Sequence, residues 1–226
     1  MKILRILLVF TVLLSLNFKQ SQAQDKKPFT GTITISLSYE GDVDAATLAQ
    51  QLKEMELKIN ATYTKMEINQ GGVYTSVIKN REKKEITTLM DIPMLGKKFC
   101  LKQNAEAVAK TLSELPKGEI KYFDETKNIA GYNCKKGELY YKDEDGKDVT
   151  SVFYYTEDLY MPNSNFDTPY MDVKGTLMEW ESSAQNMKIK QSISKVKKSK
   201  MSDKEFLIPT GYQEMTEDEL RELFSQ

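Results

Sequence analysis

The feature that most constrains the fold is an alternation of apolar and polar residues with a period of two. Between Gly31 and Tyr39 the chain carries Ile33, Ile35 and Leu37, and Thr or Ser occupies every position between the apolar ones. Successive side chains of a β-strand point to opposite faces, so this segment predicts a strand with one buried and one solvated face. Strands of this kind are typical of antiparallel sheets.

Strand-like segments recur along most of the chain. Asn69–Gly72 and Asp145–Gly146 are turn signals between such segments, and 161–169 reads as a surface loop. The predicted strands are 31–39, 57–68, 73–79, 85–91, 97–102, 138–142, 149–156, 174–182 and 186–197.

Helical patterns are fewer. They occupy 45–55 and 103–114, and a capping box at Thr216–Glu219 predicts a short terminal helix to Phe224. With about eight to ten antiparallel strands and two or three helices, the expected fold class is α+β, a meandering sheet with covering helices.

The first 23 residues have the features of a cleaved secretory signal. Lys2 and Arg5 precede an apolar run over 6–16, and Ser21-Gln22-Ala23 places small residues where signal peptidase reads. A spanning helix needs about 20 apolar residues, and this run is shorter. We predict a signal peptide of 1–23 and a single domain of 24–226 that is periplasmic or secreted, soluble, and without a lipobox Cys.

Composition removes several classes of function. The chain of 226 residues contains no His and two Cys. The absence of imidazole excludes Ser-His-Asp and Cys-His mechanisms and His-based metal sites, and two thiols cannot form a four-thiolate site. The formal charge of −1 gives no reason to expect a nucleic-acid partner. We therefore expect no enzyme, no cofactor and no metal.

Three local motifs have simpler interpretations. Ser192–Lys195 spells S-x-x-K, but its setting predicts a strand and the partner motifs of serine β-lactamases are missing. The acidic run Asp143–Asp148 has Tyr154 where a calcium loop requires Glu, and a hairpin explains it. The lysines of 195–200 could contact phosphates or lipid headgroups, or form a solvated strand end.

Cys100 and Cys134 leave two alternatives open. In an exported chain an even pair of cysteines favours a disulfide. Two buried free thiols on different strands are equally compatible with the sequence, because the Cα separation that a bridge requires cannot be read from it.

The segment Thr126–Lys136, which contains Ile-Ala-Gly-Tyr-Asn-Cys-Lys-Lys, resembles the signature of an uncharacterised exported family of Bacteroidetes, the DUF4412 domain of unknown function. That family is grouped with the LolA/LppX lipoprotein-carrier superfamily. Segments 154–159, 175–179 and 206–212 agree in order, so the resemblance covers about 29–212. Family members often carry Trp where this chain has Phe153.

The resemblance implies a curved, incomplete antiparallel β-barrel, with helices as a lid over a concave face whose cavity holds acyl chains. The alternation in the sequence is compatible with such an apolar slot, although the same side chains could instead pack a closed core. The candidate ligand-binding residues on the inner face are Ile33, Ile35, Leu37, Tyr39, Phe153, Tyr155, Met178 and Trp180.

The function expected from the resemblance is non-catalytic, periplasmic binding of a hydrophobic ligand, either an envelope lipid or a lipoprotein acyl chain. Two alternatives remain. One is an envelope protein–protein interaction module without a cavity, and the other is a hydrolase that uses two carboxylates.

Overall fold

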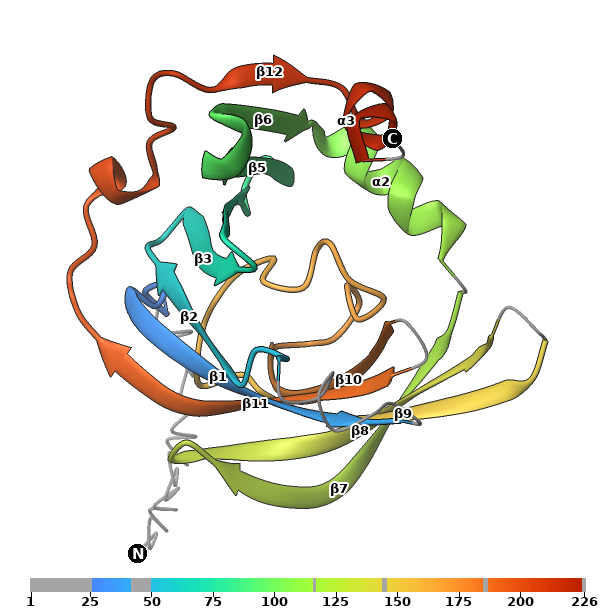
Figure 1. Cartoon of the computed structure of the whole chain (residues 1–226). Helices are drawn as coiled ribbons and strands as arrows, with labels where there is room; N and C mark the ends of the chain where they lie inside the picture. Colours follow the sequence, from blue (N-terminus) through green and yellow to red (C-terminus); the bar gives the residue numbers. More distant parts are fainter. Residues whose placement is uncertain (1–25, 42–49, 116, 144–145, 185–186, 225–226) are drawn as a thin grey trace, which may run out of the picture.

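The computed structural model describes residues 26–41, 50–115, 117–143, 146–184 and 187–224 (Figure 1). The predicted signal peptide and residues 45–49 of the predicted helix 45–55 lie outside these residues. The strands are β1 (Gly31–Glu40), β2 (Glu54–Ile59), β3 (Tyr63–Gln70), β4 (Val73–Asn80), β5 (Glu85–Ile92), β6 (Lys97–Gln103), β7 (Glu119–Ile129), β8 (Tyr132–Lys142), β9 (Asp148–Thr156), β10 (Thr176–Ala184), β11 (Met187–Lys198) and β12 (Gln213–Met215). The helices are α2 (Ala105–Glu114) and α3 (Glu217–Phe224), with 3-10 turns η1 (Pro93–Leu95) and η2 (Asp203–Phe206).

All twelve strands belong to one sheet, in the order β12-β6-β5-β4-β3-β2-β1-β11-β10-β9-β8-β7. Every neighbouring pair is antiparallel except β12 and β6, which are parallel. Two meanders, β1–β6 and β7–β11, are joined where β11 returns to pair with β1. The sheet curls round without pairing its two ends, β12 and β7 (Figure 1). The predicted curved, open antiparallel sheet is therefore confirmed.

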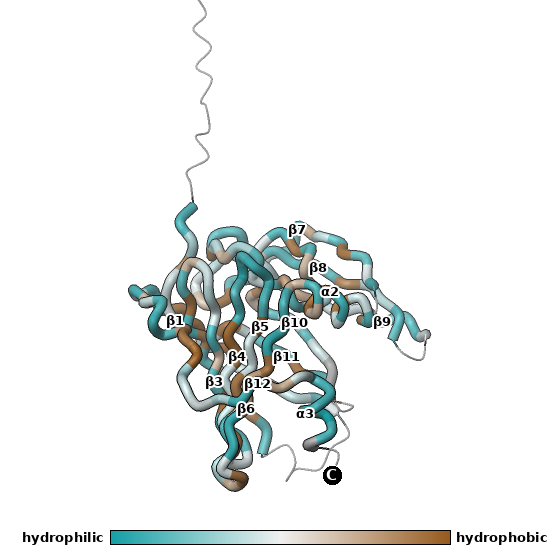
Figure 2. Tube along the Cα trace, turned by 90° about the horizontal axis from the view of Figure 1, so that it is seen from above, coloured by the Kyte–Doolittle hydropathy of each residue, from teal (hydrophilic) through white to brown (hydrophobic). Residues whose placement is uncertain are grey.

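Strand β1 confirms the alternation seen in the sequence. Ile33 and Ile35 are buried, whereas the Thr residues beside them are half-exposed. Ile33 lies between Leu57 on β2 and Val196 on β11, and a bulge follows at Thr34. In Figure 2 the hydrophobic stretches of the trace include parts of β1 and β4.

The two described helices begin at side-chain caps. The Asn104 side chain accepts a hydrogen bond from the Ala107 N–H at 2.9 Å, and Thr216 and Glu219 form the predicted capping box. Helix α2 buries Val108 and packs on β5 and β6, beside α3 (Figure 1). Both helices therefore cover the β6–β12 end of the sheet.

Four predictions of secondary structure need correction. The predicted single strand 57–68 is wrong, because a turn over 60–62 divides it between β2 and β3, and the Asn60 side chain holds this turn by accepting from the N–H groups of Thr62 and Tyr63. The predicted helix 45–55 is wrong over its described residues, because 50–53 form a turn and a connection, and Glu54 and Met55 belong to β2, where Met55 pairs with Ile35 and packs against the core. Strand β7 was missed and β8 starts earlier than predicted. Residues 121–128 are all exposed on this edge strand, so no buried face creates an alternation.

The buried apolar side chains form three clusters. The first cluster consists of Phe29, Ile33, Ile35, Ile59, Ile129, Cys134, Leu159, Met178 and Ile193. The second consists of Leu139, Phe153, Tyr155, Tyr170, Val173 and Leu177, and the third of Ile78, Leu89, Cys100 and Phe206. The connection 157–175 contributes to the first two, so it is part of the core although it contains no strand.

Candidate functional site

The eight candidate ligand-binding residues do not form one slot. Ile33, Ile35 and Met178 belong to the first cluster, and Leu37 packs against it. Tyr39 is half-buried, and its hydroxyl donates to the Leu52 carbonyl at 2.6 Å; burial raises its pKa.

Phe153 and Tyr155 lie in the second cluster, and Trp180 packs against both clusters. The ring of Tyr170 meets that of Phe153 edge-on, with centroids 5.4 Å apart. Side chains of the connection 157–175 thus cover these strands where a helical lid was predicted, and neither pocket described below contains any of the eight residues.

The connection 157–175 is held by hydrogen bonds at several points. The Thr176 hydroxyl donates to the Leu159 carbonyl at 2.6 Å, and the Asn165 amide donates to the Gly175 carbonyl at 2.8 Å. Tyr170 is buried, and its hydroxyl donates to the Glu181 carbonyl at 2.8 Å. These bonds satisfy polar groups inside an otherwise apolar region, which fixes the irregular backbone in one conformation.

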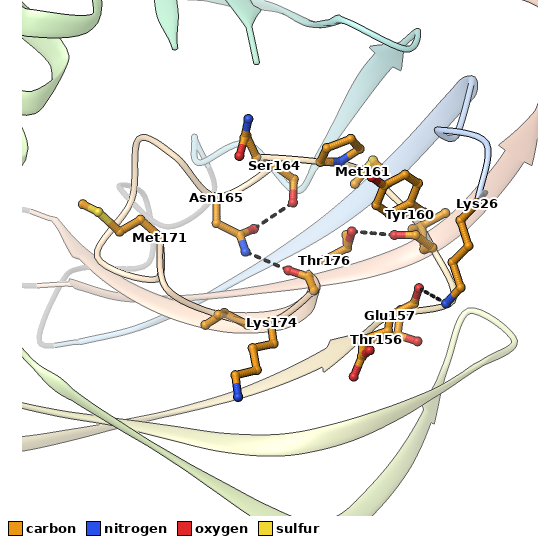
Figure 3. A pocket seen from close by; sticks show the side chains of 15 residues that line it. Lys26, Thr156, Glu157, Tyr160, Met161, Ser164, Asn165, Met171, Lys174 and Thr176 are labelled. Atoms are coloured by element: carbon orange, nitrogen blue, oxygen red, sulfur yellow. Dashed lines mark hydrogen bonds between the residues drawn. The ribbon is translucent and has the colours of Figure 1, made fainter. Parts of the chain in front are cut away.

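A pocket of about 340 Å³ opens within this connection (Figure 3). Its lining mixes apolar side chains with polar groups and two lysines. The residues are Lys26, Thr156, Glu157, Leu159, Tyr160, Met161, Pro162, Asn163, Ser164, Asn165, Met171, Val173, Lys174, Gly175 and Thr176. Sequence reasoning assigned 161–169 to a surface loop and missed the pocket, because an irregular segment carries no periodicity that marks a cavity.

The chemistry of this pocket suits an amphiphile. Met171 and Tyr160 keep 47% and 40% of their surface exposed, although both are large apolar side chains. Lys174 lies 5.7 Å from the centre of the Tyr122 ring, and the Lys26 ammonium donates to the Glu157 carbonyl at 3.1 Å. The pocket thus offers apolar contact beside positive charge.

A second pocket, of about 700 Å³, lies between β6, β12, α2 and α3. Charged groups dominate its lining and bind one another: Lys102 forms an ion pair with Glu214, and Gln103 donates to Glu217 at 2.6 Å. A lipid chain would bury little apolar surface here, because the lining is polar and its charged groups already bind one another.

Arg81 is buried and contacts both the β2–β3 turn and the connection 157–175. Its Nη2 donates to the carbonyls of Asn60 and Ala61 at 2.5 and 2.7 Å, and its own carbonyl accepts from Asn163. Nε and Nη1 have no partner among the described residues, and burial lowers the guanidinium pKa to about 10. Arg81 thereby ties the β2–β3 turn to the pocket segment.

On the opposite face from Ile193, the buried carboxylate of Glu179 pairs with two partly exposed lysines. Lys127 of edge strand β7 contacts both carboxylate oxygens at 2.9 Å, and Lys190 lies at 3.2 Å. Burial acts to raise the pKa of Glu179, but hydrogen bonds from the two lysines outweigh it and lower the pKa. Ser192 of the S-x-x-K motif donates to Glu179 from strand β11, so the motif does not lie on a helix.

Both cysteines are buried free thiols. Cys100 belongs to the third cluster and Cys134 to the first, and burial raises the pKa of each. Of the two alternatives left open by the sequence, the structure has the free thiols and forms no bridge between them.

Within the described part of the chain, no group of three or more acidic or thiol side chains could hold a metal ion. None of the helices among the described residues is long and apolar enough to cross a membrane. Neither a family model nor a curated protein matches the chain.

Proposed function

We propose that this chain is a non-catalytic binding protein of the Gram-negative cell envelope, related to the LolA-like carriers, whose ligand is a lipid or a lipoprotein acyl chain. The observation that carries the proposal is the pocket of connection 157–175, in which Leu159, Met161, Met171 and Val173 lie beside two lysines. An acyl chain would contact the apolar side chains, and Lys26 and Lys174 would face an anionic head.

The size of the pocket fits a partly bound chain. Ligand pockets range from about 300 to 1,000 Å³, so this one accommodates a small ligand or the end of a longer one. Each buried methylene contributes about 0.8 kcal/mol. The ligand is held by shape and burial, and the single carboxylate in the lining, Glu157, lacks the partner that a two-carboxylate hydrolase would require.

Mass spectrometry of organic extracts tests the proposal. The chain is recovered from the envelope of an expression host, and its N-terminus is read from the intact mass. We expect a co-purifying lipid that is lost in Met171→Asp, because a carboxylate would be placed against the chain. Leu207→Asp is the matched control, since Leu207 is 65% exposed and lies outside the pocket. Repeated absence of lipid from the folded parent protein would refute the proposal.

A protein-binding module is the second candidate. It is favoured by β7, an unpaired edge of eleven residues that could accept a strand from another envelope protein. The exposed charges along β7, which include Lys121, Asp124 and Glu125, oppose such pairing. Recovery of a stoichiometric protein with no lipid would favour this alternative.

A further inference from the structure

One end of the sheet exposes large apolar side chains that do not belong to the core. The β3–β4 and β5–β6 turns lie at this end, because Tyr74 near one turn pairs with Asp91 near the other. Met94 and Leu95 in the β5–β6 turn are 88% and 51% exposed, and Tyr74 is 52% exposed. We call Pro93–Lys98 the β5–β6 tip. In Figure 2 a hydrophobic segment lies at the lower edge of the molecule, below the label of β6.

The backbone of the tip explains why these side chains point away from the sheet. Pro93 opens the 3-10 turn, and Gly96 closes it in the left-handed conformation with φ of 59°. No residue of the turn is buried, so neither Met94 nor Leu95 contributes to the core. Two adjacent exposed apolar side chains at the end of a hairpin are typical of a surface that binds a membrane or another protein.

The net charge around the tip is positive. Lys97 and Lys98 follow the apolar pair directly, and Asp91 is the single acidic residue within 69–74 and 91–98. Asp91 is already paired with Lys98 at 2.7 Å, and Lys97 has no ion pair among the described residues. The tip is therefore positive, although the whole chain has a formal charge of −1.

We propose that the β5–β6 tip docks this protein on an anionic lipid bilayer. Met94 and Leu95 would enter the headgroup region, and Lys97 and Lys98 would face lipid phosphates. A narrow convex tip is too small for a standard protein interface, which buries about 800 Å² on each partner, but two apolar side chains flanked by lysines suit the bilayer boundary. The docking surface is separate from the pocket and does not depend on the proposed ligand.

Vesicle co-sedimentation tests the proposal. The envelope-processed chain is mixed with vesicles of phosphatidylcholine alone or with a third of phosphatidylglycerol. We expect partitioning into the anionic vesicles, reduced at least tenfold by Met94→Ser/Leu95→Ser. Lys97→Gln should reduce it about fivefold, because one lysine near an anionic surface contributes that factor. Lys83→Gln is the matched control, since Lys83 is exposed in the β4–β5 turn at the opposite end of the same strands.

Two further measurements distinguish loss of docking from misfolding and from loss of the pocket ligand. The serine variants should match the parent protein in circular dichroism, because the substituted side chains are outside the core. The Met171→Asp variant should still sediment, which separates docking from loading of the pocket. Failure of the parent protein to bind anionic vesicles, binding that survives the two serines, or loss of binding in Met171→Asp would each overturn the proposal.

Discussion

Gly137 offers the sharpest test of how the β8–β9 hairpin is packed. It lies on β8 directly opposite Phe153 of β9, and both are buried. A Cβ at residue 137 would meet the Phe153 ring, 2.5 Å from Cε2 and 2.9 Å from Cε1 and in still closer contact with Cζ. The aromatic ring therefore occupies the space that a methyl group would need.

The ring has little room to move. Phe153 is fully buried, and its centroid lies 6.1 Å from that of Tyr155 and 5.4 Å from that of Tyr170. Adding atoms to a packed core costs about 1–3 kcal/mol, and the severity of this overlap places Gly137→Ala near the upper end, at about 2–3 kcal/mol. For a domain of this size each kcal/mol lowers Tm by about 2–4 °C, so we expect a decrease of roughly 4–12 °C.

A double-mutant cycle isolates the steric effect. In Phe153→Leu the ring atoms that meet the new methyl are gone, so Gly137→Ala should be neutral there, or stabilising by about 0.4–1 kcal/mol through the unfolded chain. Urea unfolding is followed by fluorescence of Trp180, the only Trp in the chain. Equal losses in both backgrounds would refute the packing argument, since the coupling free energy should reach about 2 kcal/mol.

Two further predictions concern buried polar groups. Cys100 and Cys134 are buried free thiols with raised pKa values, so a chromogenic thiol reagent should react slowly with the native protein. After denaturation without reductant, the reagent should titrate two thiols. Finding none would establish a bridge. The lowered pKa of Glu179 means that its contribution to stability is present above its ordinary pKa and is lost as pH falls through the folded-state pKa. Glu179→Gln should therefore lower the free energy of unfolding by about 1–3 kcal/mol at pH 7, with a smaller difference near pH 3; a difference independent of pH would contradict the roles of Lys127 and Lys190.

Strand prediction succeeded where one face of a strand is buried and the other is solvated. β1 has this pattern, and the β3–β4 hairpin follows from its turn residues Gly71 and Gly72, which adopt positive φ. It failed for β7, whose side chains are exposed on both faces along most of its length. It also failed at Met55, where pairing with β1 overrides a helix-favouring composition.

The candidate site shows a different limit. The residues chosen from the alternation, such as Ile33 and Phe153, are buried in the structure as an inner face requires. Phe153 is covered by Tyr170 and Val173, and Ile33 clusters with Leu159. All three covering residues lie in the connection 157–175, whose sequence has neither the period of a strand nor that of a helix. The pocket residues of that connection could not be identified, because their proximity depends on hydrogen bonds between irregular segments that carry no local signal.

The sequence by itself determined which side chains face inward in strands with one buried face, such as β1, since a period of two in hydrophobicity follows directly from the geometry of an extended chain. It also excluded imidazole chemistry, because the chain contains no His. Only the tertiary structure decided what covers that inner face and where a cavity remains. Those outcomes depend on contacts between residues far apart in the chain, such as Tyr170 with Phe153 and Lys127 with Glu179, and local patterns do not encode them.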